Sequence, residues 1–321
     1  MELIKQLHQM GIVPVVKLDD AKDAAPLAKA LVDGGLPCAE VTFRTNAAEE
    51  SIRQMAKAFP KMLIGAGTIL TTEQVDRAIA AGATFIVSPG LNPKIVQYCV
   101  NKNIPITPGC SSPSDMEQAI ELGLTTVKFF PAEQSGGIDA IRAMSAPYSG
   151  LSFMPTGGVS AKNLQNYLSF PKIIACGGSW MVKDDLIRNG KFDEITRLTR
   201  EAIQTMLGFH LAHIGINAEN EENAKKIATG LGNLFGFPII DGNSSVFAGS
   251  HFEVMKSPFL GKNGHIAVGT YHVDRAVAHL ERQGFSFRTE TAKTDGNGNL
   301  TAIYLADEFG GFALHLVKRS D

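Results

Sequence analysis

The chain has 321 residues, of which 44% are hydrophobic and 19% are charged, and its formal net charge is −2 at pH 7. This length is sufficient for two domains, and a charge so close to zero does not indicate binding to nucleic acid or to an anionic membrane. No apolar run approaches the ~18 residues of a transmembrane helix, so we expect no membrane partner.

The N-terminus and the cysteines are typical of a cytoplasmic protein. The first residues begin an amphipathic helix and lack the apolar core and the cleavage site of a signal peptide. The four cysteines, Cys38, Cys99, Cys110 and Cys176, are widely spaced and form no CxxC motif. We therefore expect reduced cysteines in the core of a cytoplasmic protein.

From residue 12 to about residue 207, short β-branched runs alternate with segments of helical periodicity. The predicted strands are Val13–Lys17, Ala39–Arg44, Leu63–Thr68, Phe85–Ser88, Ile104–Thr107, Thr126–Phe130, Ser152–Pro155 and Ile173–Cys176. The predicted helices include Ala21–Asp33, Ala47–Phe59, Glu73–Ala81, Ser114–Leu122 and Phe192–Met206. Eight strand–helix units in roughly 200 residues favour a (β/α)8 barrel. The alternative, a doubly wound open sheet, is disfavoured because Gly65-Ala66-Gly67-Thr68 supplies only part of a dinucleotide-binding motif.

One strand carries a lysine in apolar surroundings. The stretch Val127–Glu133 is predicted to be a short buried strand that places Lys128 near Phe130 and ends at Pro131. Desolvation disfavours the charged form of a lysine, and a neutral amine can attack a ketone to form an imine. The alternative is a lysine at a strand end whose ammonium group extends into solvent.

In a (β/α)8 barrel the catalytic groups lie at the C-terminal ends of the strands. The residues predicted there are polar, small or proline: Lys17, Glu40, Arg44, Thr68, Ser88, Pro89, Gly90, Thr107, Pro108, Gly109, Lys128, Thr156, Gly157, Gly158, Gly177, Gly178 and Ser179. Tight turns explain the glycines and prolines, but they do not explain Glu40, Arg44 and Lys128. Burial of three ionisable groups is costly unless they pair or have a function.

The second predicted strand presents two opposite charges on one side. Glu40, Thr42 and Arg44 are two residues apart, so their side chains project to the same face. A carboxylate there can transfer protons, and a guanidinium can bind an anionic substrate group. A purely structural Glu–Arg pair is the alternative.

The two loops after the seventh and eighth predicted strands are rich in glycine. They contain Thr156-Gly157-Gly158-Val159-Ser160 and Gly177-Gly178-Ser179. Backbone N–H groups exposed by glycine at helix N-termini can bind an anion, and these loops are the usual phosphate position in such barrels. The pattern predicts a phosphate site.

Taken in order, these motifs resemble those of the KDPG/KHG aldolases, the class I 2-keto-3-deoxy-6-phosphogluconate / 4-hydroxy-2-oxoglutarate aldolases. The motifs are Glu40-Val41-Thr42-Phe43-Arg44-Thr45, Gly65-Ala66-Gly67-Thr68, Ser88-Pro89-Gly90, Val127–Glu133, Pro155-Thr156-Gly157-Gly158 and Gly177-Gly178-Ser179-Trp180. The resemblance covers a first domain of residues 1–208. It implies cleavage of the phosphorylated keto acid to pyruvate and glyceraldehyde 3-phosphate, with 4-hydroxy-2-oxoglutarate as a further substrate cleaved to pyruvate and glyoxylate.

The resemblance also implies a role for each site residue. Lys128 would form the imine, and Glu40 would act as the acid and base. Arg44 and Thr68 would bind the pyruvate carboxylate. The remaining substrate-binding residues would be Pro89, Phe130 and Thr156 in the pocket and Gly157, Gly158, Gly178 and Ser179 at the phosphate. The family implies no cofactor for this reaction and a homotrimer, and Lys17 is an accessory candidate.

A different pattern begins at Phe209 and contains an internal repeat. His213-Ile214-Gly215-Ile216 returns as His265-Ile266-Ala267-Val268, and Phe252–Lys256 returns as Leu314–Lys318. Each copy has about 50 residues and is predicted to form a strand, a helix and then several strands. We therefore expect a second α+β domain, residues 209–321, made of two βαβββ modules.

Two such modules resemble the vicinal oxygen chelate family, which includes glyoxalase I and ring-cleaving dioxygenases. That family places metal ligands on the first and last strands of each module, which implies His213, Glu253, His265 and His315 here. This donor set suits Zn²⁺, Ni²⁺, Mn²⁺ or Fe²⁺, although His315 stands where the family usually has a glutamate. The domain would then be a metal-dependent isomerase, lyase or dioxygenase. A metal-free binding or oligomerisation module is the alternative.

Overall fold

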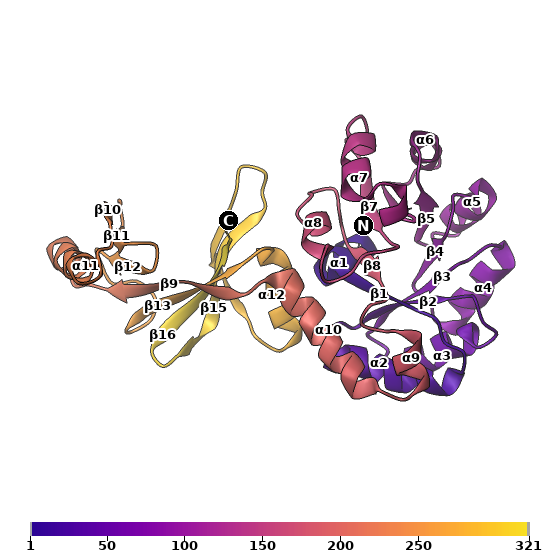
Figure 1. Ribbon diagram of the computed structural model, residues 1–321, viewed down its shortest axis with the longest axis horizontal. Helices are drawn as coiled ribbons and strands as arrows, with labels where there is room; N and C mark the ends of the chain where they lie inside the picture. Colours follow the sequence, from indigo (N-terminus) through magenta and orange to yellow (C-terminus); the bar gives the residue numbers. More distant parts are fainter. Residues whose placement is uncertain (1, 320–321) are drawn as a thin grey trace. The chain divides into compact units, whose positions relative to one another are not determined.

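The computed structural model describes residues 2–319 and divides into two compact units, with the division between Met206 and Leu207 (Figure 1). The sequence placed a domain boundary slightly later, after Gly208. Helix α10, Phe192–Leu207, ends at the division.

The first unit is built on one parallel sheet. Within residues 2–319 its eight strands, β1 to β8, span Ile12–Val16, Cys38–Thr42, Leu63–Gly67, Phe85–Ser88, Ile106–Cys110, Thr126–Phe129, Ser152–Pro155 and Cys176–Gly178. Their order is β7-β6-β5-β4-β3-β2-β1-β8, and two parallel bridges, Phe153–Ile173 and Thr156–Gly177, join β7 to the region of β8. The sheet is therefore closed on itself, which confirms the predicted (β/α)8 barrel and excludes an open doubly wound sheet.

Helices connect successive strands on the outside of this barrel, as Figure 1 shows. The α-helices α1 to α9 span Glu2–Met10, Ala24–Asp33, Ala48–Ala58, Thr72–Ala81, Pro93–Asn101, Pro113–Glu121, Gly137–Ser145, Leu164–Leu168 and Asp184–Arg188, and the 3₁₀ turns η1 and η2 span Ala21–Asp23 and Glu133–Ser135. Some begin at side-chain caps: Thr71 accepts a hydrogen bond from the Gln74 backbone N–H, and Ser112 and Asp115 form a capping box. The caps start these helices directly after the loops that follow the strands.

The fifth and eighth strands were predicted too early in the sequence. Both strands begin and end later than the sequence indicated, at Ile106–Cys110 and Cys176–Gly178. Glycine and proline were interpreted there as turn residues. However, Cys176, Gly177 and Gly178 pair in register with β1, so pairing with a neighbouring strand outweighs local preference.

The second unit contains two consecutive βαβββ segments. The first comprises β9 His210–Asn217, α11 Glu221–Phe235, β10 Ile239–Asp241, β11 Ser245–Ala248 and β12 Phe252–Met255; the second comprises β13 Gly264–Thr270, α12 Val273–Arg282, β14 Phe287–Thr294, β15 Leu300–Phe309 and β16 Phe312–Lys318. Among the described residues they form one mixed sheet with the order β10-β11-β12-β9-β13-β16-β15-β14. The predicted repeat is therefore visible as two halves that meet at β9 and β13.

The two halves join through their first strands. β9 and β13 pair in antiparallel orientation, whereas each first strand pairs in parallel with the last strand of its own segment. Helix α11 packs on β11 and β12, and α12 packs on β15 and β16. The core beneath α11 is small and aliphatic, with Ala224, Ala228, Val246, Ala248 and Val254 all buried. Between residues 2 and 319, no helix has both the length and the apolar composition that a membrane crossing requires.

Candidate active site and candidate metal centre

The two ionisable residues at the centre of the barrel contact each other. Lys128 on β6 and Glu40 on β2 are 5% and 1% exposed, and the Lys128 Nζ lies 3.2 Å from the Glu40 Oε1. The ring of Phe130 has its centroid 5.2 Å from the same Nζ. The pairing offsets the cost of burying both charges. The other carboxylate oxygen, Oε2, has no hydrogen-bond partner within residues 2–319 and is therefore available to a bound molecule.

A glycine on the neighbouring strand makes room for this carboxylate. A Cβ atom at Gly67, on β3, would lie 2.2 Å from the Glu40 Oε1. Real Cβ atoms do not approach an oxygen so closely, so any side chain at residue 67 would displace Glu40 from Lys128. The Gly65-Ala66-Gly67-Thr68 motif thus has a steric role in the barrel and is not a dinucleotide-binding turn.

Arg44 and Thr68 lie together just beyond the ends of β2 and β3. The Arg44 Nε donates a hydrogen bond to the Thr68 Oγ1 at 3.2 Å. Thr68 has a φ of 58°, a left-handed conformation that is costly for a β-branched residue and that often marks a functional site. In this conformation the Thr68 hydroxyl lies against the guanidinium. Two donors for one anionic group are therefore brought close together.

A pocket of about 230 Å³ lies at this end of the barrel. Among the described residues its lining consists of Val15, Val16, Lys17, Thr42, Arg44, Phe130, Thr156, Gly157, Gly158, Val159, Gly177, Gly178, Ser179 and Asp184. The predicted residues Arg44, Phe130, Thr156, Gly157, Gly158, Gly178 and Ser179 are thus brought together. The other predicted residues, Glu40, Thr68, Pro89 and Lys128, are outside this lining. The Pro89 carbonyl oxygen lies against Gly109 of β5.

The loop after β7 opens toward the pocket and carries two glycines with left-handed backbones. Gly157 has a φ of 101° and Gly158 a φ of 80°. The Thr156 Oγ1 is buried and has no hydrogen-bond partner in the part of the chain that the structure describes. A bound polar group would satisfy this hydroxyl, as buried polar atoms require. The loop therefore offers polar groups to a ligand at the pocket's edge.

Two acidic residues of the pocket region were not predicted as site residues. The Lys17 Nζ lies 2.9 Å from Asp19 Oδ1 and 3.8 Å from Asp184 Oδ2. Lys17 and Asp184 both line the pocket. Asp184 is the first residue of α9. An acidic residue at the start of a helix that follows a glycine-rich loop could have indicated this position from the sequence. These carboxylates orient the Lys17 ammonium at the opening.

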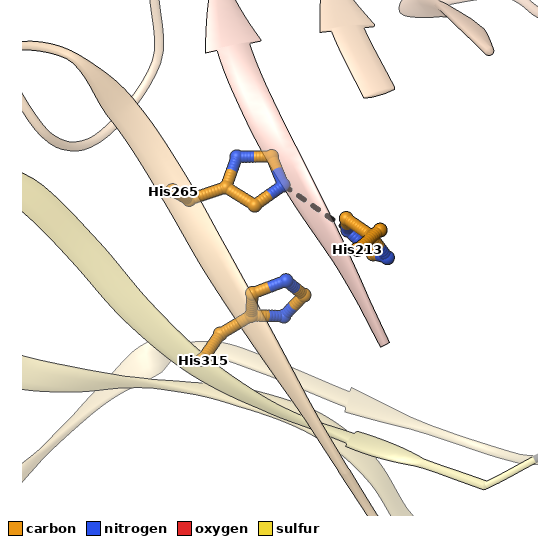
Figure 2. Close-up of side chains that lie close together, drawn as sticks. All are labelled: His213, His265 and His315. Atoms are coloured by element: carbon orange, nitrogen blue, oxygen red, sulfur yellow. Dashed lines mark hydrogen bonds between the residues drawn. The ribbon is translucent and has the colours of Figure 1, made fainter. Parts of the chain in front are cut away.

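The second unit brings together the four residues predicted as metal ligands. Figure 2 shows His213, His265 and His315 facing one another from β9, β13 and β16. One nitrogen of each imidazole lies within 4.8 Å of those of the other two. The Glu253 Oε2, on β12, is 3.0 Å from the His213 Nε2 and 3.1 Å from the His265 Nε2. Three imidazoles from three strands therefore lie together, and the Glu253 carboxylate contacts two of them.

The interactions around this cluster orient its members. Burial by itself would raise the pKa of Glu253, but hydrogen bonds from His213, His265 and Ser245 outweigh burial and hold that pKa well below its usual range. The Ser245 Oγ donates to the second oxygen of Glu253 at 2.7 Å. The carboxylate is therefore ionised and directed at the histidines.

His315 is the least satisfied member of the cluster. It is 8% exposed, and neither of its ring nitrogens has a hydrogen-bond partner within residues 2–319. The Tyr304 ring stacks on it with a centroid separation of 4.5 Å. Burial, followed by the neighbouring His265 and His213, lowers the pKa of His315 to about 3. A neutral imidazole with an unused nitrogen next to two further histidines and a carboxylate is a donor set that fits a divalent cation.

The fold and the first site together define a class: a closed (β/α)8 barrel with a buried lysine paired with a carboxylate, next to a pocket with a glycine-rich edge. Residues 3–198 match the family described as KDPG and KHG aldolase. The chain belongs to this family, and its first unit is an aldolase of the aldehyde-lyase class. The match ends before the second unit begins.

The chain is similar to several characterised proteins along this unit. The 2-dehydro-3-deoxy-phosphogluconate aldolase of Haemophilus influenzae is 51% identical over 202 residues, covering 63% of this chain and 95% of that protein. The KHG/KDPG aldolase of Escherichia coli is 42% identical over 193 residues, covering 60% and 91%. The crystal structure of the KDPG aldolase from Legionella pneumophila, with pyruvate captured as a covalent carbinolamine intermediate, has a TM-score of 0.60 at 36% identity, covering 62% of this chain and 97% of that one.

Proposed function

We propose that the barrel cleaves 2-keto-3-deoxy-6-phosphogluconate to pyruvate and glyceraldehyde 3-phosphate through an imine on Lys128, and also cleaves 4-hydroxy-2-oxoglutarate to pyruvate and glyoxylate. The observation that carries the proposal is the buried contact of 3.2 Å between the Lys128 Nζ and the Glu40 Oε1. The names of the relatives support the choice of substrate.

The reaction follows from this pair. The Lys128 amine attacks the C2 ketone of the sugar acid, and loss of water gives a protonated imine that accepts electrons. Glu40, through a water molecule, removes the proton of the C4 hydroxyl, and the C3–C4 bond breaks. Glyceraldehyde 3-phosphate leaves, the enamine is protonated at C3, and hydrolysis releases pyruvate and the free amine.

The other pocket residues bind the two ends of the substrate. Arg44 and Thr68 hold the carboxylate next to the reacting ketone, since a guanidinium and a hydroxyl can both donate to it. Phe130 and Thr156, which line the pocket, contact the carbon chain, and the family resemblance adds Pro89, which lies outside this lining. The phosphate binds at the other end, at the residues with exposed backbone N–H groups or a hydroxyl: Gly157, Gly158, Gly178 and Ser179.

The test is reductive trapping. The full chain is incubated with pyruvate and borohydride, digested, and analysed by mass spectrometry. We expect a pyruvyl adduct on Lys128 that is absent from the Lys128→Ala variant, with Lys57→Ala, an exposed lysine on α3, as the matched control. Absence of an adduct from every lysine would overturn the proposal.

We also propose that the chain works in the cytoplasm as a homotrimer, as its family resemblance implies. The four buried cysteines are in keeping with a reducing compartment. Sedimentation equilibrium of the full chain measures the oligomeric state, and a monomer or dimer over the working concentration range would contradict the trimer.

For the second unit we propose a single divalent metal ion bound by His213, Glu253, His265 and His315, in a domain of the vicinal oxygen chelate type. The proposal is supported by the three imidazoles that lie together, by the contacts of Glu253 with two of them, and by the nitrogens of His315 that have no partner among residues 2–319. The metal would act as a Lewis acid for an oxygen ligand, which suits an isomerase, lyase or dioxygenase. The competing proposal is a metal-free binding or oligomerisation module.

Metal binding separates these two proposals. The full chain is treated with chelator and titrated separately with Zn²⁺, Ni²⁺, Mn²⁺ and Fe²⁺ in a calorimeter. We expect one equivalent to bind, with affinity at least ~100-fold weaker in His213→Ala and in His265→Ala. His251→Ala is the control, because His251 is an exposed histidine of the same unit. No binding of any of the four ions would leave the metal-free module.

A further inference from the structure

The loop that follows the lysine strand is attached to the glycine loop of the pocket. The Ala132 backbone N–H donates to the Thr156 carbonyl at 2.8 Å, and the Glu133 N–H donates to the Gly157 carbonyl at 3.1 Å. The loop that continues from the Lys128 strand is thus hydrogen-bonded directly to the loop that carries Gly157 and Gly158. These two bonds couple the position of the Gly157-Gly158 loop to the strand that carries the amine.

The side chain of Glu133 adds a second connection between these loops. A Cβ atom at Gly158 would lie 2.4 Å from the Glu133 Cγ, so the glycine backbone rests on the stem of this glutamate. The Glu133 Oε1 accepts a hydrogen bond from the Tyr167 hydroxyl. Tyr167 lies on α8, the helix that follows the glycine loop. Glu133 therefore lies beneath the loop and is bonded to the helix behind it.

Tyr167 is placed rigidly enough to hold this carboxylate. The residue is 1% exposed. Burial, followed by the adjacent Glu133 carboxylate, raises the pKa of Tyr167, so its hydroxyl stays protonated and donates. Glu133 itself is exposed and would be free to change rotamer without this bond. A buried donor that loses its acceptor is costly, which favours the observed arrangement.

We propose that Glu133 and Tyr167 are positioning residues that hold the Gly157-Gly158 loop at a fixed place relative to Lys128, and so set the preference of the barrel for phosphorylated substrates. Neither residue contacts the reacting atoms; both act through the loop. The inference rests on the proposed function, because it assumes that the loop binds the phosphate.

The test compares a phosphorylated substrate with the same keto acid lacking phosphate, 2-keto-3-deoxygluconate. In Tyr167→Phe, which keeps the ring and its packing, we expect the KM for the phosphorylated substrate to rise about tenfold while the KM for the other changes less than about twofold. Glu133→Ala should have the same effect, and the double variant should be no worse than either single variant. Glu133→Gln should restore most of the affinity, because its amide oxygen can accept from Tyr167.

A matched control exists in the same unit. The Tyr148 hydroxyl donates to the Glu117 carboxylate at 3.1 Å, outside the lining of the pocket. Tyr148→Phe removes a bond of the same kind and should leave the ratio of the two KM values unchanged.

The outcomes distinguish the inference from the proposed function. Equal losses on both substrates, or no loss in Tyr167→Phe and Glu133→Ala, would overturn the positioning role. Trapping of pyruvate, which has no phosphate, is measured in every variant. Normal trapping with an unchanged KM ratio rejects only the positioning role. Absence of trapping in the unaltered chain rejects the proposed function itself.

Discussion

Each unit of this chain buries a cluster of ionisable side chains, but the clusters differ in how their charges are matched. In the barrel, Lys128 and Glu40 carry opposite charges and satisfy each other at 3.2 Å. In the second unit, three imidazoles lie together with a carboxylate against two of them, and neither nitrogen of His315 has a partner within residues 2–319. Among residues 2–319, the first cluster pairs its two opposite charges and leaves one oxygen of Glu40 without a hydrogen-bond partner, whereas the second leaves a whole imidazole without one.

This difference separates two kinds of chemistry. A lysine held by a carboxylate can form a covalent bond and recover its proton from the same partner. Imidazoles that face one another can all bind one cation. The contrast leads us to propose covalent catalysis in the barrel and metal binding in the second unit, and the predictions below test whether the two sites are independent.

The largest expected effect is loss of the amine. Lys128→Ala should reduce kcat/KM for aldol cleavage by at least about a thousandfold, because the imine pathway is lost. Metal binding by the second unit should be unaffected in the same variant, as calorimetry can show. If kcat/KM of the Lys128→Ala variant stayed within about tenfold of the unaltered chain, the barrel would not use covalent catalysis by Lys128, and the proposed difference between the two sites would be wrong.

The second effect is slow alkylation of the cysteines, all of which lie in the barrel unit. Burial raises the pKa of Cys99 to about 11 and that of Cys110 to about 12, so little reactive thiolate exists at pH 8. Alkylation of Cys99 should be about a hundredfold slower in the native chain than after unfolding. Labelling followed by mass spectrometry during thermal denaturation thus reports unfolding of the barrel alone. Rapid labelling of the native chain at pH 8 would contradict the buried environment of these thiols.

A smaller effect is expected at the phosphate residues. Ser179→Ala should raise the KM for the phosphorylated keto acid about tenfold, because one donor to the phosphate is lost. The KM for the unphosphorylated keto acid should change by less than about twofold. Steady-state kinetics on both substrates give the ratio. If this substitution spared turnover of the phosphorylated substrate, Ser179 would have no part in phosphate binding.

The smallest effect is expected from metal removal. Chelator treatment should change aldol cleavage by less than about twofold, because the proposed barrel chemistry uses only lysine and carboxylate. The melting temperature of the second unit should fall, since a ligand that binds only the folded state stabilises it. Loss of aldol cleavage on chelation, restored by added metal, would show that the two sites are coupled.

Much of the barrel site could be predicted from the sequence. The ends of parallel strands meet at one edge of a barrel, so a lysine at one strand end and a glutamate at another are expected to lie close together. The hydrogen bond between Tyr167 and Glu133 could not be predicted. The two residues are 34 positions apart, and their contact depends on how α8 packs behind the glycine loop.

By itself the sequence determined the two architectures, because strand and helix periodicity and the internal repeat are local patterns. It also identified the three histidines that lie together in the second unit and the glutamate that contacts two of them. Whether they meet was decided by tertiary structure, through the antiparallel register that places His213 opposite Ala267 and His265 opposite Gly215. A shift of one residue in that register would turn each side chain to the other face of the sheet. The contacts between strands of different modules therefore depend on how the two modules pair in the sheet, and the sequence of one segment alone does not determine that pairing.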